Sequence, residues 1–195
     1  MIRFLKNLLK SKTETFKDKT NFKELVSKKE VQELFKLINS YSNESEVRFV
    51  GGCVRKLINN EVVDDIDLST NLRPEKVIEI LKNYNINFYE TGINHGTVTA
   101  VINDKSFEIT SLRKDIKTDG RHAQVEYTKD WLDDASRRDF TINAIYSDKD
   151  GNLFDPYNGK NDLIDGAIKN GGALPRHFLE NRILRRQRFI QTYLR

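Results

Sequence analysis

Cysteine is nearly absent from this sequence: Cys53 is the only one among 195 residues. A single thiol cannot form an intramolecular disulfide, which excludes a disulfide-stabilised domain, so we expect a cytoplasmic protein in which Cys53 is buried and inert. Long apolar runs are absent too. No segment is long enough to span a bilayer as a helix, so we expect no membrane partner. The sequence also lacks internal repeats and low-complexity linkers.

The excess of charge of one sign is small. The sequence has 33 Lys and Arg against 29 Asp and Glu, a net charge of +4, which favours a polyanionic partner only weakly. Hydrophobic residues make up 37% and charged residues 32%, as is typical of a folded domain with a core. The final arginine-rich segment, 182–195, predicts an amphipathic helix with a basic face. Residues 1–12 predict a basic helix packed on the domain, with a transit peptide or membrane-surface helix as alternatives.

The spacing of apolar residues predicts helices mixed with strands. We expect helices over 22–41, 54–60, 75–84 and 131–146, and strands over 47–50, 64–70, 86–92, 96–103 and 106–113. Hairpin turns are predicted at 103–105 and within 148–159, and a polar loop over 114–129. Thr70 or Asn71 is the expected N-cap of the helix that begins near Pro74. This order predicts an α+β fold with one mixed sheet flanked by helices.

The most informative stretch is VRFVGGCVRKLINNEVVDDIDLST, residues 47–70, which carries two aspartates one residue apart. Side chains at i and i+2 of a strand point to the same face, so Asp65 and Asp67 are expected to project together. At about 3.3 Å rise per residue they lie roughly 6 to 7 Å apart, which suits a two-metal Mg²⁺ site for phosphoryl transfer. The alternative is a pair of solvent-facing aspartates on an edge strand.

Two glycines lie between the strand and the helix of the same stretch. Without Cβ atoms, Gly51 and Gly52 let backbone N–H groups approach a phosphate at the N-terminus of the helix, where Arg55 can reach the same anion. A glycine pair alone more often marks a tight turn. The combination with Asp65 and Asp67 in one unit predicts a site for a triphosphate.

A third carboxylate is expected on a neighbouring strand, where it would complete the metal shell and take the proton of an attacking hydroxyl. Glu108 alternates with Phe107 and Ile109, so it faces away from the core. The alternative is an ordinary surface glutamate. Arg113, just beyond, either meets the triphosphate or covers the surface.

Four blocks of the sequence carry a family resemblance. They are FVGGCVRKLI…DDIDLST, HGTVTAVI…SFEITSLRKDI, TDGRHAQVEYTKDWLDDASRRDFTINAIY and NLFDPYNGKNDLIDG. Together they resemble the head domain of class II tRNA nucleotidyltransferases (CCA-adding enzymes) and bacterial poly(A) polymerases. The resemblance implies a polymerase-β-like nucleotidyltransferase head over 22–160, after a basic extension (1–21) and before the start of a helical neck (161–195).

The resemblance also implies roles for individual residues. Triphosphate binding falls to Gly51, Gly52 and Arg55, Mg²⁺ binding to Asp65 and Asp67, and contacts with the incoming nucleotide to Arg138, Asp139 and Asn143. Asp139 would act through the ribose hydroxyls. From the residues alone, Asp139 and Asn143 are i and i+4 neighbours on a helix, and the alternative is a surface Arg–Asp pair.

The last segment departs from the family pattern. The family's neck carries a base-templating helix of the form E-D-x-x-R-x-x-R, whereas this sequence reads FLENRILRRQRF. Glu180 and Arg185 are the nearest equivalents of the base-templating residues. Asn181 offers an amide where the family has a carboxylate, which changes the donor pattern presented to a base.

The sequence therefore predicts an RNA nucleotidyltransferase. It would add CMP or AMP from CTP or ATP to the 3′ end of tRNA or another RNA, by CCA addition or poly(A) synthesis, with Mg²⁺ in a two-metal site. One competing interpretation is a catalytically impaired nucleotide- or RNA-binding remnant. Another is one half of a split enzyme, in which a second chain supplies the body and tail.

Overall fold

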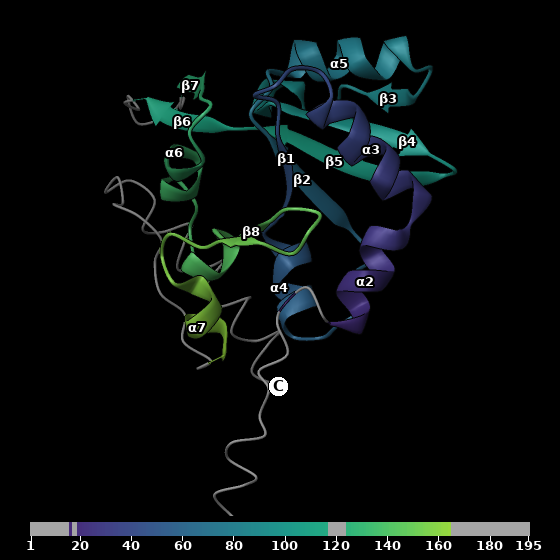
Figure 1. The fold of residues 1–195 in the computed structure, drawn as a ribbon. Coiled ribbons are helices and arrows are strands. Elements are labelled where there is room, and N and C mark those ends of the chain that lie inside the picture. Colours follow the sequence, from purple (N-terminus) through teal and green to yellow (C-terminus); the bar gives the residue numbers. More distant parts are fainter. Residues whose placement is uncertain (1–15, 17–18, 117–123, 165–195) are drawn as a thin grey trace, which may run out of the picture.

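The computed structural model describes Phe16 and residues 19–116 and 124–164 of the chain (Figure 1). The predicted basic extension therefore lies almost wholly outside the described residues, as does the predicted templating segment with Glu180 and Arg185. Within the described ranges, no helix has the length and apolar character needed to cross a membrane.

One mixed sheet organises the domain. Its strands are β1 (Val47–Val50), β2 (Ile66–Thr70), β3 (Asn87–Tyr89), β4 (Thr97–Ile102), β5 (Lys105–Ser111), β8 (Tyr146–Ser147) and β9 (Leu153–Phe154). Their order is β3-β4-β5-β2-β1-β8-β9, with β2 and β5 parallel and the other neighbouring pairs antiparallel. The predicted α+β class with one mixed sheet is confirmed. Because β2 lies at the centre of the sheet, the alternative that placed the aspartates on an edge strand is wrong.

Four helices cover one face of this sheet and enclose the main core. They are α2 (Thr20–Ser27), α3 (Lys29–Asn39), α4 (Gly52–Ile58) and α5 (Pro74–Asn83). Figure 1 shows α3 in front of the sheet, and its buried Leu34 and Phe35 join Phe49, Leu68 and Ile109 of the strands in one apolar cluster. Since side chains alternate along a strand, Asp67 of β2 and Arg48 of β1 lie on the opposite face.

The predicted helix over 22–41 is two helices. Lys28 adopts an extended backbone (φ −62°, ψ 128°) between α2 and α3, and its N–H donates to the backbone oxygen of Leu25. The break allows Phe22 on α2 and Leu34 on α3 to reach the same core from different directions. Tertiary packing here overrides a helical spacing that is continuous in the sequence.

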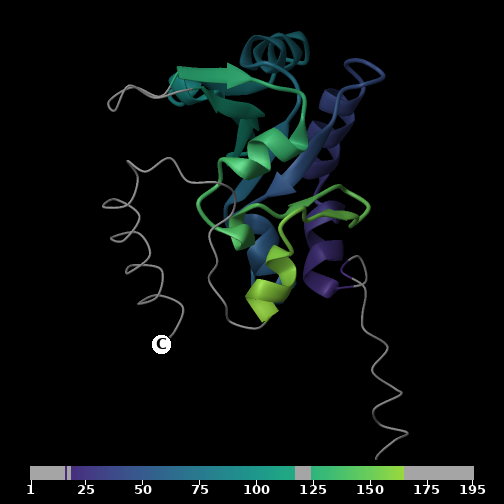
Figure 2. The ribbon, with the colours of Figure 1, turned by 90° about the vertical axis from the view of Figure 1, so that its left-hand side faces the viewer.

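The region after β5 differs most from the prediction. The predicted polar loop 114–129 contains a two-stranded ribbon, β6 (Arg113–Ile116) with β7 (Gln124–Tyr127). The predicted helix 131–146 is a short helix α6 (Trp131–Ser136), a 3₁₀ turn η3 (Thr141–Asn143) and then β8. A continuous helix is excluded because Tyr146 pairs with Val50 of β1 in the sheet. Figure 2 shows α6 between the ribbon and helix α7 (Gly159–Ile164).

Two local predictions have different outcomes. The hairpin turn between β4 and β5 is confirmed: Asn103 and Asp104 have φ of 51° and 60°, the backbone of a tight two-residue turn. The predicted N-cap of α5 is wrong, because Arg73 occupies that position and Pro74 begins the helix. The Thr70 hydroxyl instead donates to the backbone oxygen of Glu46 and accepts from the N–H of Leu72.

Cys53 lies in the core, as predicted, with 1% of its surface exposed. Burial, followed by the negative charge of Asp67, raises the pKa of its thiol to about 12. The thiol therefore stays protonated and unreactive at neutral pH.

Glu30 gives the fold a pH-dependent contact. Its carboxylate accepts hydrogen bonds from Lys105 at 3.0 Å and from Asn103 at 3.2 Å, which ties α3 to the β4–β5 hairpin. Its own backbone N–H, then Lys105 and Asn103, lower the pKa of this carboxyl from 4.5 to about 2. Because the folded pKa lies below the unfolded one, the stabilisation is complete above pH 4.5 and is lost as pH falls through 2.

We expect Glu30→Gln to unfold at a lower temperature than the unmodified chain at pH 6, and the difference to shrink as pH falls toward 2, since the carboxylate then becomes protonated in the folded state as well as in the unfolded one. Thermal unfolding followed by circular dichroism between pH 2 and pH 7 measures the difference. A gap that stays constant across this range would contradict the assignment.

Candidate active site

The candidate site begins at the glycine turn that follows β1. Gly51 has φ +63° and ψ −123°, a backbone that residues with a Cβ rarely adopt. A Cβ added there would lie 3.8 Å from Nη1 of Arg138 and 3.9 Å from the backbone oxygen of Asn143. A Cβ on Gly52 would lie 3.8 Å from Nη2 of Arg55 and 3.9 Å from Oδ2 of Asp67. The turn therefore brings two arginines and one aspartate together.

The predicted carboxylates gather around Asp67. Asp67 on β2 and Glu108 on β5 are register partners of the parallel pair, so they lie side by side on the face away from the core. Asp65 lies one residue before β2, outside the strand that was predicted to include it. Asp65 and Glu108 are exposed, whereas Asp67 is half-buried.

Burial raises the pKa of the Asp67 carboxyl above its ordinary value, and the negative charges of Glu108 and Asp65 raise it further. The guanidinium groups of Arg138 and Arg55 act in the opposite direction. The pKa therefore rises because burial and crowding by like charges exceed the effect of the nearby cations.

The oxygen-only donor set has the chemistry that Mg²⁺ prefers. Crowding of Asp67 by Asp65 and Glu108 is an observation that fits a divalent cation, which would offset the repulsion between them. Across residues 19–116 and 124–164, no group of three or more His, Cys, Asp or Glu side chains is arranged to hold a metal ion. The fit of the site to Mg²⁺ therefore rests on the chemistry of the three carboxylates and on their closeness to one another.

Arg138 and Asn143 of the RRDFTINA block adjoin the glycine turn, and Asp139 is linked to it through Asn143. Arg55 donates through Nη1 to Oδ1 of Asn143, and Asn143 donates through Nδ2 to Oδ1 of Asp139 at 3.1 Å. Arg138 donates through Nη1 to the backbone oxygen of Asn143 at 3.4 Å. Asp139 and Asn143 are in contact as predicted, but a turn and η3 join them, and not a continuous helix.

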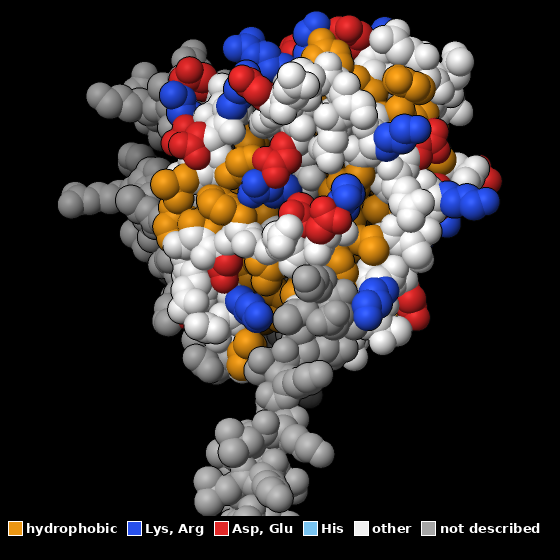
Figure 3. All heavy atoms as spheres, viewed as in Figure 1, with side chains coloured by type: hydrophobic (Ala, Val, Ile, Leu, Met, Phe, Trp, Pro, Cys, Tyr) orange, Lys and Arg blue, Asp and Glu red, His pale blue; other side chains and the backbone are white. Residues whose placement is uncertain are grey.

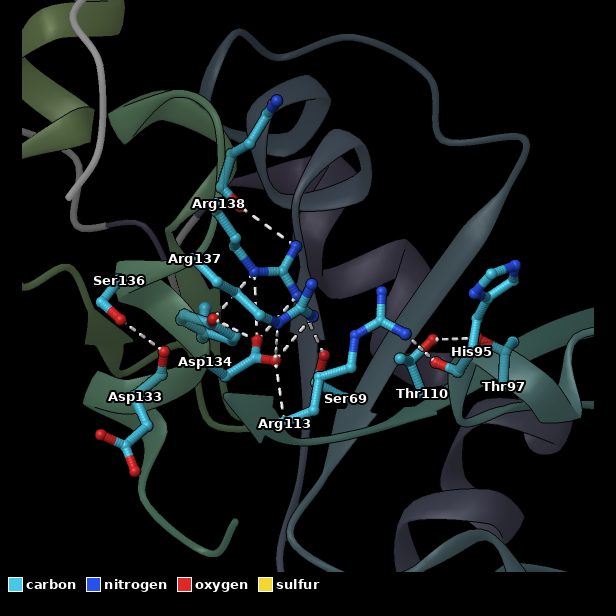
Figure 4. Close-up of polar contacts among 12 residues, drawn as sticks. Ser69, His95, Thr97, Thr110, Arg113, Asp133, Asp134, Ser136, Arg137 and Arg138 are labelled. Carbon is cyan, nitrogen blue, oxygen red and sulfur yellow. Dashed lines mark hydrogen bonds and ion pairs between the residues drawn. The ribbon is translucent and has the colours of Figure 1, made fainter. Parts of the chain in front are cut away.

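Asp134, which the sequence analysis did not single out, supports this group (Figure 4). Its carboxylate is 1% exposed and pairs with Arg137 at 2.7 Å and Arg138 at 3.0 Å. The alternative of a surface Arg–Asp pair is therefore wrong for Arg138, whose ion pair is largely buried. The available signal was an acidic residue three and four positions before two arginines.

Arg113 lies at the start of β6, at the edge of this group. Its guanidinium donates to the backbone oxygen of His95, and its backbone N–H donates to Oδ1 of Asp134 at 3.3 Å. Figure 4 shows the side chain extending toward η2 (Ile93–His95). A triphosphate contact for Arg113 stays a prediction.

Charge elsewhere on the surface is mixed. Acidic and basic side chains are interspersed over the face that carries α2 and α3 (Figure 3). The site lies on the other face of the sheet, where Arg55 and Arg138 adjoin the glycine turn. The positive charge beside the glycine turn therefore comes from this local arrangement and not from the small net charge.

A parallel strand pair that carries carboxylates, next to a glycine turn lined by arginines, agrees with the nucleotidyltransferase head domain that the sequence predicts. Residues 47–169 match the model of the family described as "Poly A polymerase head domain". Because this match covers more than half of the chain, the chain belongs to the poly(A) polymerase head domain family.

Individual relatives agree with this membership. The chain is 44% identical over 147 residues to "CCA tRNA nucleotidyltransferase 1, mitochondrial" of Homo sapiens, covering 74% of this chain and 34% of that protein. The CCA-adding enzyme of Bacillus stearothermophilus in complex with CTP superposes with a TM-score of 0.71 at 28% identity, over 88% of this chain and 39% of that one.

A tRNA nucleotidyltransferase complexed with a primer tRNA and an incoming ATP analog gives a TM-score of 0.61 at 26% identity, over 80% of this chain and 44% of that one. The chain thus spans about a third of the length of the curated relative and less than half of each solved structure.

Proposed function

We propose that this domain transfers CMP or AMP from CTP or ATP to an RNA 3′ end, as tRNA CCA addition or poly(A) synthesis. The observation that carries the proposal is the position of Gly52, within 4 Å of both Arg55 and the Asp67 carboxylate at the place of its missing Cβ. A triphosphate and a metal-binding carboxylate could meet there without a side chain between them. The names of the relatives, which include CTP and primer tRNA complexes, support the choice of substrates.

The cofactor that we propose is Mg²⁺ in a two-metal site. Asp65 and Asp67 would hold it, and Glu108 is the further oxygen donor beside them. When bound, the metal supplies charge neutralisation for the triphosphate and activation of the attacking hydroxyl. The family is one of nucleotidyltransferases, which are generally metal-dependent; the identity of the ion is our proposal.

The residues of the chain divide the remaining tasks. Arg55 and Arg138 offset the negative charge of the triphosphate beside the glycine turn. Asn143, which contacts both Arg55 and Asp139, links α4 to η3. Asp139 would accept hydrogen bonds from the ribose hydroxyls, and Glu108 would take the proton of the RNA 3′-hydroxyl. The mechanism is one of positioning and electrostatics, with no covalent enzyme intermediate.

Incubating the 195-residue chain with Mg²⁺, radiolabelled CTP or ATP and a tRNA that lacks its terminal nucleotides tests the proposal. We expect label in the tRNA, and its loss with EDTA. Sequencing the extended ends separates CCA addition from poly(A) synthesis. Nucleotide binding without incorporation would favour the impaired remnant or a split enzyme with a second chain. The absence of both binding and incorporation would refute the proposal.

The predicted cytoplasmic location is the remaining proposal. It rests on the low cysteine content and must be weighed against a relative whose name states that it is mitochondrial. Fractionation of cells that express a tagged version of the complete gene product would decide between the two compartments.

A further inference from the structure

Asp134 accepts six hydrogen bonds from three segments of the chain. Oδ1 accepts from Nε and Nη2 of Arg137 at 2.9 and 2.7 Å and from the backbone N–H of Arg113 at 3.3 Å. Oδ2 accepts from Nε and Nη2 of Arg138 at 3.2 and 3.0 Å and from the Tyr146 hydroxyl at 2.7 Å. One buried carboxylate therefore joins α6, the start of β6 and β8.

The network fixes the orientation of the Arg138 guanidinium. Its Nε–Nη2 edge is held by Asp134, and Nε also donates to the Tyr146 hydroxyl at 2.9 Å. Its Nη2 reaches the Ser69 hydroxyl on β2 at 3.4 Å. The remaining nitrogen, Nη1, is directed at Gly51 and at the backbone oxygen of Asn143. Figure 4 shows Arg138 between Asp134 and Ser69.

The charge balance of the network agrees with this orientation. Burial raises the pKa of the Asp134 carboxyl, but the guanidinium groups of Arg138 and Arg137 and the Tyr146 hydroxyl outweigh it, so the net pKa lies below the ordinary value. Asp134 stays ionised at neutral pH. Because it faces two arginines, the cluster retains an excess positive charge beside the glycine turn.

We propose that Asp134 is a positioning residue for nucleotide binding: by holding one edge of Arg138 together with Tyr146, it directs the Nη1 end of that guanidinium toward the phosphates of a nucleotide at the Gly51 turn. The inference rests on the proposed function. It adds a residue that does not touch the nucleotide and acts through another. A role confined to stability would anchor α6 to the sheet without changing affinity for a nucleotide.

The test compares Asp134→Asn with Asp133→Asn, a change of the neighbouring acid on the same helix. Asp133 accepts from the Thr128 hydroxyl at 3.0 Å and belongs to a different contact. Calorimetric titration with CTP and with ATP, in Mg²⁺ and at a temperature where every variant is folded, gives the dissociation constants. We expect Asp134→Asn to weaken binding about tenfold, within the range for coupled residues of one network, and Asp133→Asn to leave it unchanged.

A double-mutant cycle separates positioning from stability. If Asp134 acts through Arg138, Asp134→Asn should weaken binding no further in a chain that already carries Arg138→Ala. Additive losses, or unchanged affinity in Asp134→Asn, would overturn the inference.

Asp134→Asn leaves two buried arginines without their carboxylate and could fail to fold. In that case Tyr146→Phe decides, because it removes one hydroxyl and no charge. We expect it to weaken nucleotide binding about threefold, a smaller loss than for Asp134→Asn because the ion pair between Asp134 and Arg138 stays in place; unchanged affinity would overturn the inference. If the unmodified chain binds neither nucleotide, the proposed function fails and this inference fails with it. Binding by the unmodified chain with equal binding by the variants refutes positioning alone.

Discussion

Replacing Asp67 with alanine should reduce nucleotide incorporation by at least about a thousandfold while the domain stays folded. Asp67 adjoins the glycine turn, lies beside Glu108 in register and is close to both site arginines. A loss of this size corresponds to about 4 kcal/mol of transition-state stabilisation, the range expected for metal-assisted charge neutralisation. Initial rates of label incorporation into tRNA at saturating CTP measure it.

Removing the charge of Asp67 should not lower the stability of the domain. The Asp67 carboxyl is half-buried, and its pKa is raised by burial and by Glu108 and Asp65. Its ionised form is therefore destabilising in the absence of a metal, and Asp67→Asn should unfold at the same or a higher temperature than the unmodified chain in EDTA. A functional carboxylate held against its electrostatic preference is expected at a catalytic site.

Asp64→Ala is the matched control. Asp64 comes from the same DDIDLST stretch, but it is exposed and pairs with Lys56 at 3.4 Å. Loss of such a surface pair has little effect, so incorporation and stability should both stay close to those of the unmodified chain. Wild-type turnover by Asp67→Ala, or equal losses in Asp64→Ala and Asp67→Ala, would show that the carboxylate assignment is wrong.

Alanine at the two neighbouring glycines should affect different properties, the stability of the domain at Gly51 and the affinity for a nucleotide at Gly52. At Gly51 the φ of +63° imposes backbone strain of about 1–3 kcal/mol on any residue with a Cβ, so Gly51→Ala should unfold at a lower temperature. Gly52 has no such φ, and its Cβ would make ordinary contacts at 3.8 and 3.9 Å. Gly52→Ala should therefore keep the stability of the domain.

Gly52→Ala should instead lower the affinity of the domain for a nucleotide. The added methyl group would stand between Arg55 and Asp67, where we place the triphosphate, and should weaken CTP binding at least about tenfold. Thermal unfolding and calorimetric titration of both variants check the pair. If a folded Gly52→Ala domain bound CTP with unchanged affinity, the triphosphate would not bind at this turn.

Several features of the site could be predicted from residues alone because they depend on local geometry. The glycine turn after β1 follows from the order of an apolar run and two glycines. The placement of Asp67 opposite Leu68 follows from the alternation of a strand. The β4–β5 turn follows from Asn103 and Asp104, which tolerate positive φ better than most residues.

Other features needed the folded chain. The RRDFTINA block reads as one helix because its apolar residues have helical spacing, yet Tyr146 joins β1 in the sheet and ends that helix early. The segment that forms β6 and β7 was predicted as a loop because it is rich in polar residues. In the structure these two strands pair with each other, separately from the main sheet. The spacing of apolar residues within one segment does not show that the segment pairs with a strand about 95 residues away, as Tyr146 does with Val50.

The sequence by itself determined the family, the glycine turn, and the presence of two strands whose acidic side chains face away from the core. Only the tertiary structure decided that β2 and β5 lie side by side, that Asp67 adjoins Gly52, and that Asp134 orients Arg138. The physical reason is the separation along the sequence of the residues that interact. Backbone conformation and side-chain alternation are set within a few residues, whereas charge crowding and buried ion pairs arise where distant segments pack together.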